Sequence, residues 1–329
     1  MIAYRVIKRI VAACVWNLLL LQLAMATATD FAVPTERPPA HEMPLGLEAY
    51  EPNAFGYTKN NDDVHYENFK VSVEIQLMRL HTNDQNRAYF SFTGVFAFYI
   101  GDRESGPVVG QEYNPQFFYK HLWSCNKDGK TGNSTDSSSS TSGDNERCYF
   151  TIGYNHDSNG QIIGSSGQFL ETARNQTYAA AYDGISRGWD YIGINSKFAL
   201  PGHDLGGQVT LYPMFKYFLA HGLLQGNPEE LHDWEHPPDA KPRRDVDGVT
   251  LLAKYQPKIG LPGANLGVGF TTGYERSFKY NTVRFEAGCN LPFLDLPLTF
   301  WVQNGYMSDL SRYYQRVKGY GVQVEIASF

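Results

Sequence analysis

The sequence predicts an all-β protein, a twelve-stranded antiparallel transmembrane β-barrel. Twelve segments alternate apolar and polar residues with a period of two, the pattern of β-strands. Charged residues recur on one face of these segments near their midpoints, where a soluble sandwich would bury them without partners but a membrane barrel has a polar lumen. No stretch after residue 30 is long and apolar enough for a spanning helix. The even number of strands fits a barrel with both termini in the periplasm.

The first part of the chain supplies seven of these strands. Phe69, Val71 and Val73 share one face of an early strand, and Lys70 and Glu74 share the other. The same alternation recurs in each of the seven. They are predicted at 53–61, 68–81, 88–101, 111–124, 147–158, 189–200 and 206–218.

Five further strands follow up to the last residue. Val283 and Phe285 alternate with Arg284 and Glu286, again placing two charges on the face opposite an apolar one. The terminal aromatic Phe329 ends the last strand, which is a weak mark of a bacterial outer-membrane barrel. These strands are predicted at 249–259, 264–274, 281–293, 297–308 and 315–329.

Three long inserts interrupt a barrel predicted to occupy 51–329. They lie at 125–148, 159–188 and 219–248. The first is rich in Ser, Gly and Asp and is flanked by Cys125 and Cys148. In an oxidising compartment these two cysteines could pair and close the insert, although two unpaired thiols are the alternative.

The N-terminus has the pattern of an export signal at 1–26. Arg5, Lys8 and Arg9 precede an apolar stretch at 11–23, and small residues allow cleavage after Ala26 or Ala28. An uncleaved membrane anchor is the alternative. Residues 27–50 are then a periplasmic segment. The net charge of −6 gives no indication of nucleic-acid binding.

The most informative motif is Gly-Tyr-Asn-His-Asp-Ser-Asn-Gly at 153–160. Side chains two apart on a strand share a face, so His156 and Ser158 lie side by side with Tyr154 on the apolar, outward face. Asn155 and Asp157 lie on the other face. A base beside a hydroxyl on a lipid-facing surface indicates a serine hydrolase with an apolar substrate.

Four motifs together resemble the outer-membrane phospholipase A family. The run at 153–160 is close to that family's catalytic signature, and Ser-Arg-Gly-Trp-Asp at 186–190 is similar to its Ser-Arg-Ser-Trp-Asn. Glu-Tyr-Asn-Pro-Gln at 112–116 and Tyr-Gln-Pro-Lys-Ile-Gly at 255–260 resemble two of its strands. The resemblance implies a multi-pass barrel in the cell outer membrane that hydrolyses phospholipid and lysophospholipid acyl esters, with calcium, as a reversible homodimer.

The resemblance also implies residue roles. Ser158 is the nucleophile, His156 the general base, and Asp190 stands where the family has asparagine. Parity agrees, because Asp190 shares its face with the outward Ile192 and Ile194. An aspartate makes the imidazole more basic than an asparagine does, and its charge needs hydration or pairing near lipid. Backbone N–H groups of Ser158 and Gly160 complete the oxyanion hole.

For calcium, the resemblance implies three ligands: the Ser186 hydroxyl, the Gln161 carbonyl and Ser105 from the partner subunit. Two features depart from the family. The spacing between Gly160 and Ser186 is longer, and Gly94 stands where the family has an interface glutamine.

Other hypotheses remain for the same residues. The barrel could be a catalytically silent pore or scaffold, or a calcium-independent esterase. His-Asp-Trp-Glu-His at 232–236 matches a zinc-peptidase pattern that needs a helix, but Pro237 and Pro238 end any helix there, so a solvated acidic loop is the better interpretation.

Overall fold

All described residues belong to the second of two compact units, which comprises Glu42–Phe329. The computed structural model describes residues 47–61, 65–79, 85–100, 109–125, 147–202, 206–237, 239–258, 262–291, 296–307 and 309–326. The predicted signal peptide at 1–26, and all of the predicted periplasmic segment at 27–50 except its last residues, lie outside these ranges.

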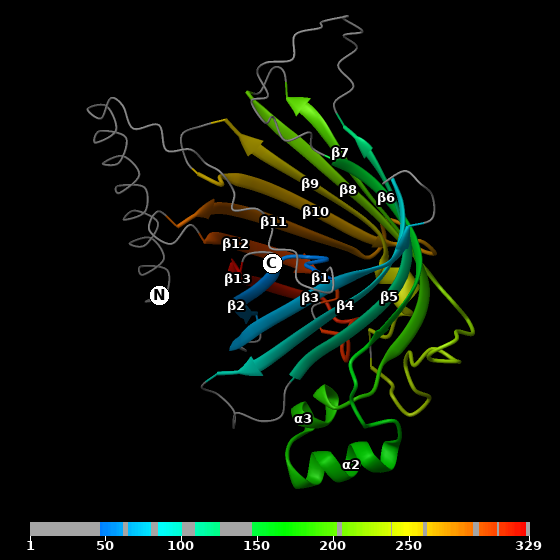
Figure 1. Ribbon diagram of the computed structural model, residues 1–329. Coiled ribbons are helices and arrows are strands. Elements are labelled where there is room, and N and C mark those ends of the chain that lie inside the picture. The colour runs from blue at the N-terminus through cyan, green and yellow to red at the C-terminus, as the bar shows by residue number, and fades with distance from the viewer. Residues whose placement is uncertain are drawn as a thin grey trace, which may run out of the picture. The chain divides into compact units, whose positions relative to one another are not determined.

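Twelve antiparallel strands, β2 to β13, form a closed barrel (Figure 1). Each strand pairs with its neighbours in sequence, and β13 pairs with β2 to close the cylinder. The predicted fold class is therefore confirmed. The strands are β2 (Asn53–Asn60), β3 (His65–Arg79), β4 (Asn86–Tyr99), β5 (Val109–Ser124), β6 (Arg147–Ser158), β7 (Gly188–Gly202), β8 (Gly207–Phe218), β9 (Gly248–Pro257), β10 (Asn265–Gly273), β11 (Asn281–Asn290), β12 (Pro297–Gly305) and β13 (Val317–Ile326).

The predicted strand boundaries agree closely with these elements, and β6 matches its predicted range at both ends. One element was not predicted. A short strand, β1 (Leu47–Glu48), pairs with the end of β3 opposite Ile75 and Glu74. It is too short to show an alternating pattern of its own.

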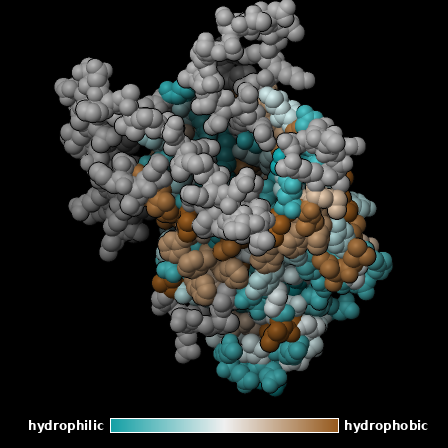
Figure 2. All heavy atoms as spheres, in the orientation of Figure 1, coloured by the Kyte–Doolittle hydropathy of each residue, from teal (hydrophilic) through white to brown (hydrophobic). Residues whose placement is uncertain are grey.

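The two faces of the wall differ as the alternation predicts. Val71 and Phe300 are each about half exposed on the outside, whereas Ser72 and Thr299, one residue along each strand, are buried on the inside. Figure 2 shows apolar side chains mainly over the barrel wall and hydrophilic ones over the end that carries the helices. Within the described ranges, no helix has the length and hydropathy to cross a membrane.

The inward charges are paired with one another, which explains how strand midpoints accommodate them. Lys120 Nζ lies 2.8 Å from Glu74 Oε1, and Arg284 Nε lies 2.7 Å from Glu286 Oε1. Ion pairs and polar side chains thus line the lumen, as the charge pattern predicted.

Two of the three long inserts contain helices. The connection after β6 contains α2 (Ser166–Asn175) and α3 (Tyr178–Asp183), whose N-caps are Ser165 and Thr177. The connection after β8 contains the short α4 (Arg243–Val246). At the opposite end, Cys125 and Cys148 form a disulfide that closes the first insert, residues 126–146 of which lie outside the described ranges.

An apolar cluster closes the helical end of the barrel. Its central members, Trp189, Val246, Tyr313 and Tyr314, are almost fully buried and come from β7, α4 and the connection before β13. This cluster supports the ends of β6 and β7, where the predicted catalytic residues lie.

Candidate active site

The ends of β6 and β7 bring the predicted catalytic residues together. The antiparallel register places His156 directly opposite Asp190, and Ser158 directly opposite Gly188. Directly paired residues point to the same face of a sheet, so His156, Ser158 and Asp190 share one face. That face is the outer one, because the alternate residue Asp157 is fully buried and Ile152, farther along β6, is exposed.

His156 and Asp190 form a short hydrogen bond. His156 Nδ1 lies 2.7 Å from Asp190 Oδ1. This bond sets the imidazole tautomer, because Nδ1 carries its proton toward the carboxylate. Nε2 is then the ring nitrogen without a proton, and Ser158 stands two residues farther along the same face. A strand rises about 6.6 Å over two residues, a gap that a histidine side chain leaning along the strand can span.

The second oxygen of Asp190 accepts three further hydrogen bonds. The Tyr154 hydroxyl donates to Oδ2, and the backbone N–H groups of Leu224 and Gln225 donate to it at 2.8 and 2.9 Å. Tyr154 accepts in turn from the Leu223 N–H at 2.6 Å. The carboxylate thus has the hydrogen-bond donors that a charge near lipid needs.

These donors explain why an aspartate suits this position. An asparagine could present its carbonyl oxygen to His156 or to the two backbone amides, but not to both. Its NH₂ group would then face donors that need an acceptor. The site around Asp190 is therefore built for a carboxylate.

The amide turn, residues 222–226, presents those two N–H groups, and sequence reasoning missed it. The Gly222 N–H donates to the Gly226 carbonyl at 2.7 Å, and Gly226 has a positive φ of 69°. A Cβ on Gly222 would lie 1.8 Å from Asp190 Oδ2, so only glycine fits there. The two glycines four residues apart were the available signal, but they lay in an insert with no strand pattern.

The predicted oxyanion residues lie at the turn that follows β6. Gly160 has a positive φ of 58°, and a Cβ there would lie 2.8 Å from the Tyr113 ring. Between them, the Asn159 N–H donates to the Arg187 carbonyl and is therefore engaged. The backbone N–H groups of Ser158 and Gly160 remain the predicted donors.

Two of the three predicted calcium ligands lie close together. The Asn159 side-chain oxygen accepts from the Arg187 N–H at 2.9 Å and from the Gln161 N–H at 3.3 Å, which holds Gln161 next to the Ser186–Arg187 peptide. The Ser105 position falls at 101–108, outside the described residues.

Glu229 is an unpredicted neighbour of Ser186. The Ser186 hydroxyl donates to Glu229 Oε2 at 2.6 Å. A carboxylate and a hydroxyl side by side are hard oxygen donors, the type that Ca²⁺ prefers. In the described part of the chain, no three His, Cys, Asp or Glu side chains gather as a metal site. A calcium site here would therefore draw on hydroxyl and carbonyl oxygens as well, as the predicted ligand set does.

The inner face of β6 is held by a buried charge cluster. Arg243 of α4 bonds Asp157 and lies 3.2 Å from Asp247 Oδ2, and all three are buried. Its guanidinium also stacks 4.4 Å from the Trp189 ring. Although burial alone lowers the pKa of Arg243, Asp157 and Asp247 raise it above the ordinary value.

The 232–236 segment is only partly solvated, with Asp233 and His236 exposed but Glu235 buried, which corrects the sequence interpretation. Glu235 is buried and forms a two-pronged ion pair with Arg187, at 2.7 and 2.6 Å. His232 stacks on Trp234, with ring centroids 5.3 Å apart. Glu235 serves a structural ion pair here and is not aligned with two histidines on a helix.

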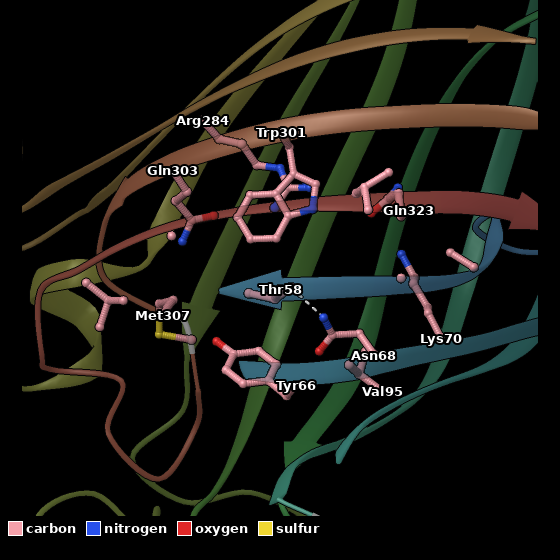
Figure 3. A pocket seen from close by; sticks show the side chains of 15 residues that line it. Thr58, Tyr66, Asn68, Lys70, Val95, Arg284, Trp301, Gln303, Met307 and Gln323 are labelled. Carbon is pink, nitrogen blue, oxygen red and sulfur yellow. Dashed lines mark hydrogen bonds between the residues drawn. The ribbon is translucent and has the colours of Figure 1, made fainter. Parts of the chain in front are cut away.

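A cavity of about 230 Å³ lies in the lumen, away from the catalytic face. Figure 3 shows Arg284, Trp301, Gln303, Tyr66 and Lys70 pointing toward the same space from strands on both sides. Arg284 stacks on Trp301 at 4.2 Å and Lys70 pairs with Glu51, so these cations have partners.

Comparison with solved structures identifies the fold. An active-site mutant of Escherichia coli outer membrane phospholipase A superposes with a TM-score of 0.58 over 88% of this chain and 95% of its own, at 18% identity. The fold is that of outer membrane phospholipase A. The Salmonella typhi phospholipase, a dimer with bound calcium, gives a TM-score of 0.56 over 86% of this chain and 93% of its own, also at 18% identity.

No protein-family model and no curated protein matches the chain. The likeness to outer membrane phospholipase A that the motifs predicted is thus confirmed in the fold, at a sequence identity that leaves the chemistry to be argued from this chain's own residues.

Proposed function

We propose that this protein is an outer-membrane phospholipase that hydrolyses acyl esters of phospholipids and lysophospholipids. The observation that carries the proposal is the His156–Asp190 pair beside Ser158 on the lipid-facing wall. In a lumen, the same residues would meet water-soluble substrates. On the outer wall near the helical rim, they meet the ester region of a membrane lipid.

The chain's own residues perform an acyl transfer to serine. His156 Nε2 takes the proton of Ser158 as its oxygen attacks the ester carbonyl carbon. The backbone N–H groups of Ser158 and Gly160 stabilise the negative oxygen that forms. Collapse breaks the ester bond, and His156 returns the proton to the leaving alcohol. Water, deprotonated by His156, then hydrolyses the acyl-serine.

Calcium is part of the proposal. The Ser186 hydroxyl, the Gln161 carbonyl and the Glu229 carboxylate would hold it, with Ser105 from a partner subunit. When bound beside the oxyanion, a divalent cation supplies further stabilisation of the developing negative charge.

A reversible homodimer is the proposed assembly, in the outer membrane as a multi-pass barrel. At Gly94, a Cβ would lie 3.1 Å from the Phe96 ring and 3.3 Å from the Phe92 ring, so aromatic rings occupy the space of the family's glutamine. An interface on this face would therefore be apolar. The bound calcium and dimer of the Salmonella typhi neighbour support the two proposals by analogy.

The decisive test is phospholipid hydrolysis by the full-length barrel refolded in detergent, in mixed micelles with calcium or with EGTA. We expect hydrolysis with calcium, strong suppression by EGTA, and none by Ser158→Ala. A sulfonyl fluoride should label the wild type and leave Ser158→Ala unlabelled. Calcium-independent hydrolysis would favour a plain esterase. Ion conductance in planar bilayers without labelling would favour a passive pore.

A further inference from the structure

Gly188 leaves a space beside Ser158 that another side chain fills. Gly188 is the direct cross-strand partner of Ser158. A Cβ on Gly188 would lie 2.4 Å from Gln225 Oε1, 2.8 Å from its Cδ and 3.3 Å from its Nε2. The carboxamide of Gln225 thus occupies the position that a side chain at residue 188 would take, on the same face as the Ser158 hydroxyl.

The backbone of Gln225 is held in place independently. Its N–H donates to Asp190 Oδ2 at 2.9 Å, and the amide turn that contains it is closed by the bond from Gly222 to Gly226. The side chain therefore extends from a point fixed by Asp190 itself.

The expected separation between the Gln225 carboxamide and Ser158 suits a contact between the carboxamide and the reacting ester. The Cβ atoms of directly opposed residues in an antiparallel pair lie about 5 Å apart, so the carboxamide lies about that far from the Ser158 Cβ. A tetrahedral carbon bonded to Ser158 Oγ would project its oxygens into this gap. Side-chain amides of Asn and Gln are established oxyanion donors in other hydrolases.

We propose that the Gln225 side-chain N–H is a third oxyanion donor, in addition to the backbone N–H groups of Ser158 and Gly160. The proposal rests on the proposed function and adds a catalytic residue to it. The second motif supports it: where the family's signature has serine, this chain has Gly188, and glycine leaves room for the carboxamide.

Kinetics of Gln225→Ala and Gln225→Glu test the proposal. We expect kcat to fall about 10²-fold in Gln225→Ala with KM little changed, because the donor acts on the transition state. Gln225→Glu keeps the shape but replaces the donor by a negative charge, so it should lose at least as much. Affinity for a lipid trifluoromethyl ketone, whose hemiketal mimics the oxyanion, should fall by the same factor as kcat/KM. Gln176→Ala, an exposed glutamine on α2's C-cap, is the matched control.

A double-mutant cycle separates this role from a structural one. Gly188→Ala should displace the flexible end of Gln225 and lower kcat similarly, and adding it to Gln225→Ala should cause little further loss. Additive losses, or kcat within twofold of wild type in Gln225→Ala, would overturn the proposal. A wild type that neither hydrolyses phospholipid nor reacts with sulfonyl fluoride would instead refute the proposed function.

Discussion

At the end of β6, the outer and inner faces differ in exposure and in the partners of their polar side chains. On the outer face, Tyr154, His156 and Ser158 are partly exposed and the first two are linked sideways to Asp190. On the inner face, Asn155 and Asp157 are buried, and Asp157 is neutralised by Arg243. Reactive groups need access to substrate and a path for protons. The inner groups need neither, and the buried ion pair between Asp157 and Arg243 ties β6 to α4.

Substitutions on the outer face should have the larger effect on the rate of hydrolysis. Replacing the base, His156→Ala, should lower kcat about 10²–10⁴-fold while leaving the barrel folded, because general base catalysis contributes on that scale. The measurement is hydrolysis of a lysophospholipid, with heat-shifted gel migration as the test of folding. Near-normal activity in a folded His156→Ala barrel would remove His156 from the mechanism.

Substitutions among the inner-face charges should have the larger effect on the free energy of unfolding. Arg243→Leu leaves Asp157 buried without its cation and leaves Asp247 with Lys216 alone, so it should lower the free energy of unfolding by about 3–5 kcal/mol. Arg244→Leu is the matched control, because Arg244 is half exposed and its pair with Glu275 is a surface one worth at most about 1 kcal/mol. Urea titration in lipid vesicles measures both. Equal effects of the two substitutions would show that the buried charge cluster stabilises the barrel no more than a surface ion pair does.

Asp190→Asn tests the carboxylate that joins His156 to the amide turn. The amide group leaves either His156 or the backbone N–H groups of Leu224 and Gln225 without an acceptor, so we expect kcat to fall about 10–100-fold. The shape of the pH–rate profile should differ from that of the wild type, because the substitution removes a negative charge beside the imidazole. A profile that superposes on the wild type would show that the carboxylate charge is irrelevant.

Acid should weaken the buried charge cluster of Asp157, Arg243 and Asp247 through Asp247, and only at low pH. Burial raises the pKa of this carboxyl, but Lys216 and Arg243 outweigh burial and hold it below its ordinary value of 3.8. The stabilisation is therefore complete above that ordinary value and is lost as pH falls through the lower folded-state pKa. Unfolding free energies measured from pH 7 to pH 3 should show this loss in the wild type and a smaller one in Asp247→Asn. An identical pH dependence in both would refute it.

The smallest effect is expected from Tyr154→Phe. Asp190 keeps His156 and both amide donors and loses one hydrogen bond, and the exposed Leu223 N–H exchanges the Tyr154 hydroxyl for water. We expect kcat to fall about two- to tenfold, in line with about 0.5–1.5 kcal/mol for one bond. Tyr178→Phe, an exposed residue of α3, serves as control. A loss as large as that of Asp190→Asn would mean that Tyr154 orders the amide turn as well.

Periodicity predicted the barrel well because it is local. The alternation from Phe69 to Glu74 places each side chain on a face without reference to any other strand. The same parity placed His156 and Ser158 together, and the motif at 186–190 brought Asp190 to them. The structure adds the register between β6 and β7, which sets His156 directly opposite Asp190.

The support of the site could not be predicted in this way. Gln225, Glu229 and Arg243 lie in a connection without strand alternation, and their partners Gly188, Ser186 and Asp157 are 37–86 residues away in sequence. Nothing local in the sequence specifies such contacts. The same reason explains the misjudged segment at 232–236, whose proline-ended pattern gave no sign that Glu235 would be buried against Arg187.

By itself, then, the sequence determined which residues face outward and which face the lumen, and that Ser158 and His156, the proposed nucleophile and base, share the outward face, because a two-residue period follows from backbone geometry alone. The tertiary structure alone decided how the Asp190 charge is satisfied, which side chain fills the space over Gly188, and which cation neutralises Asp157. Those outcomes depend on how a long insert folds back over the barrel rim, and packing between distant segments is set by the whole chain at once.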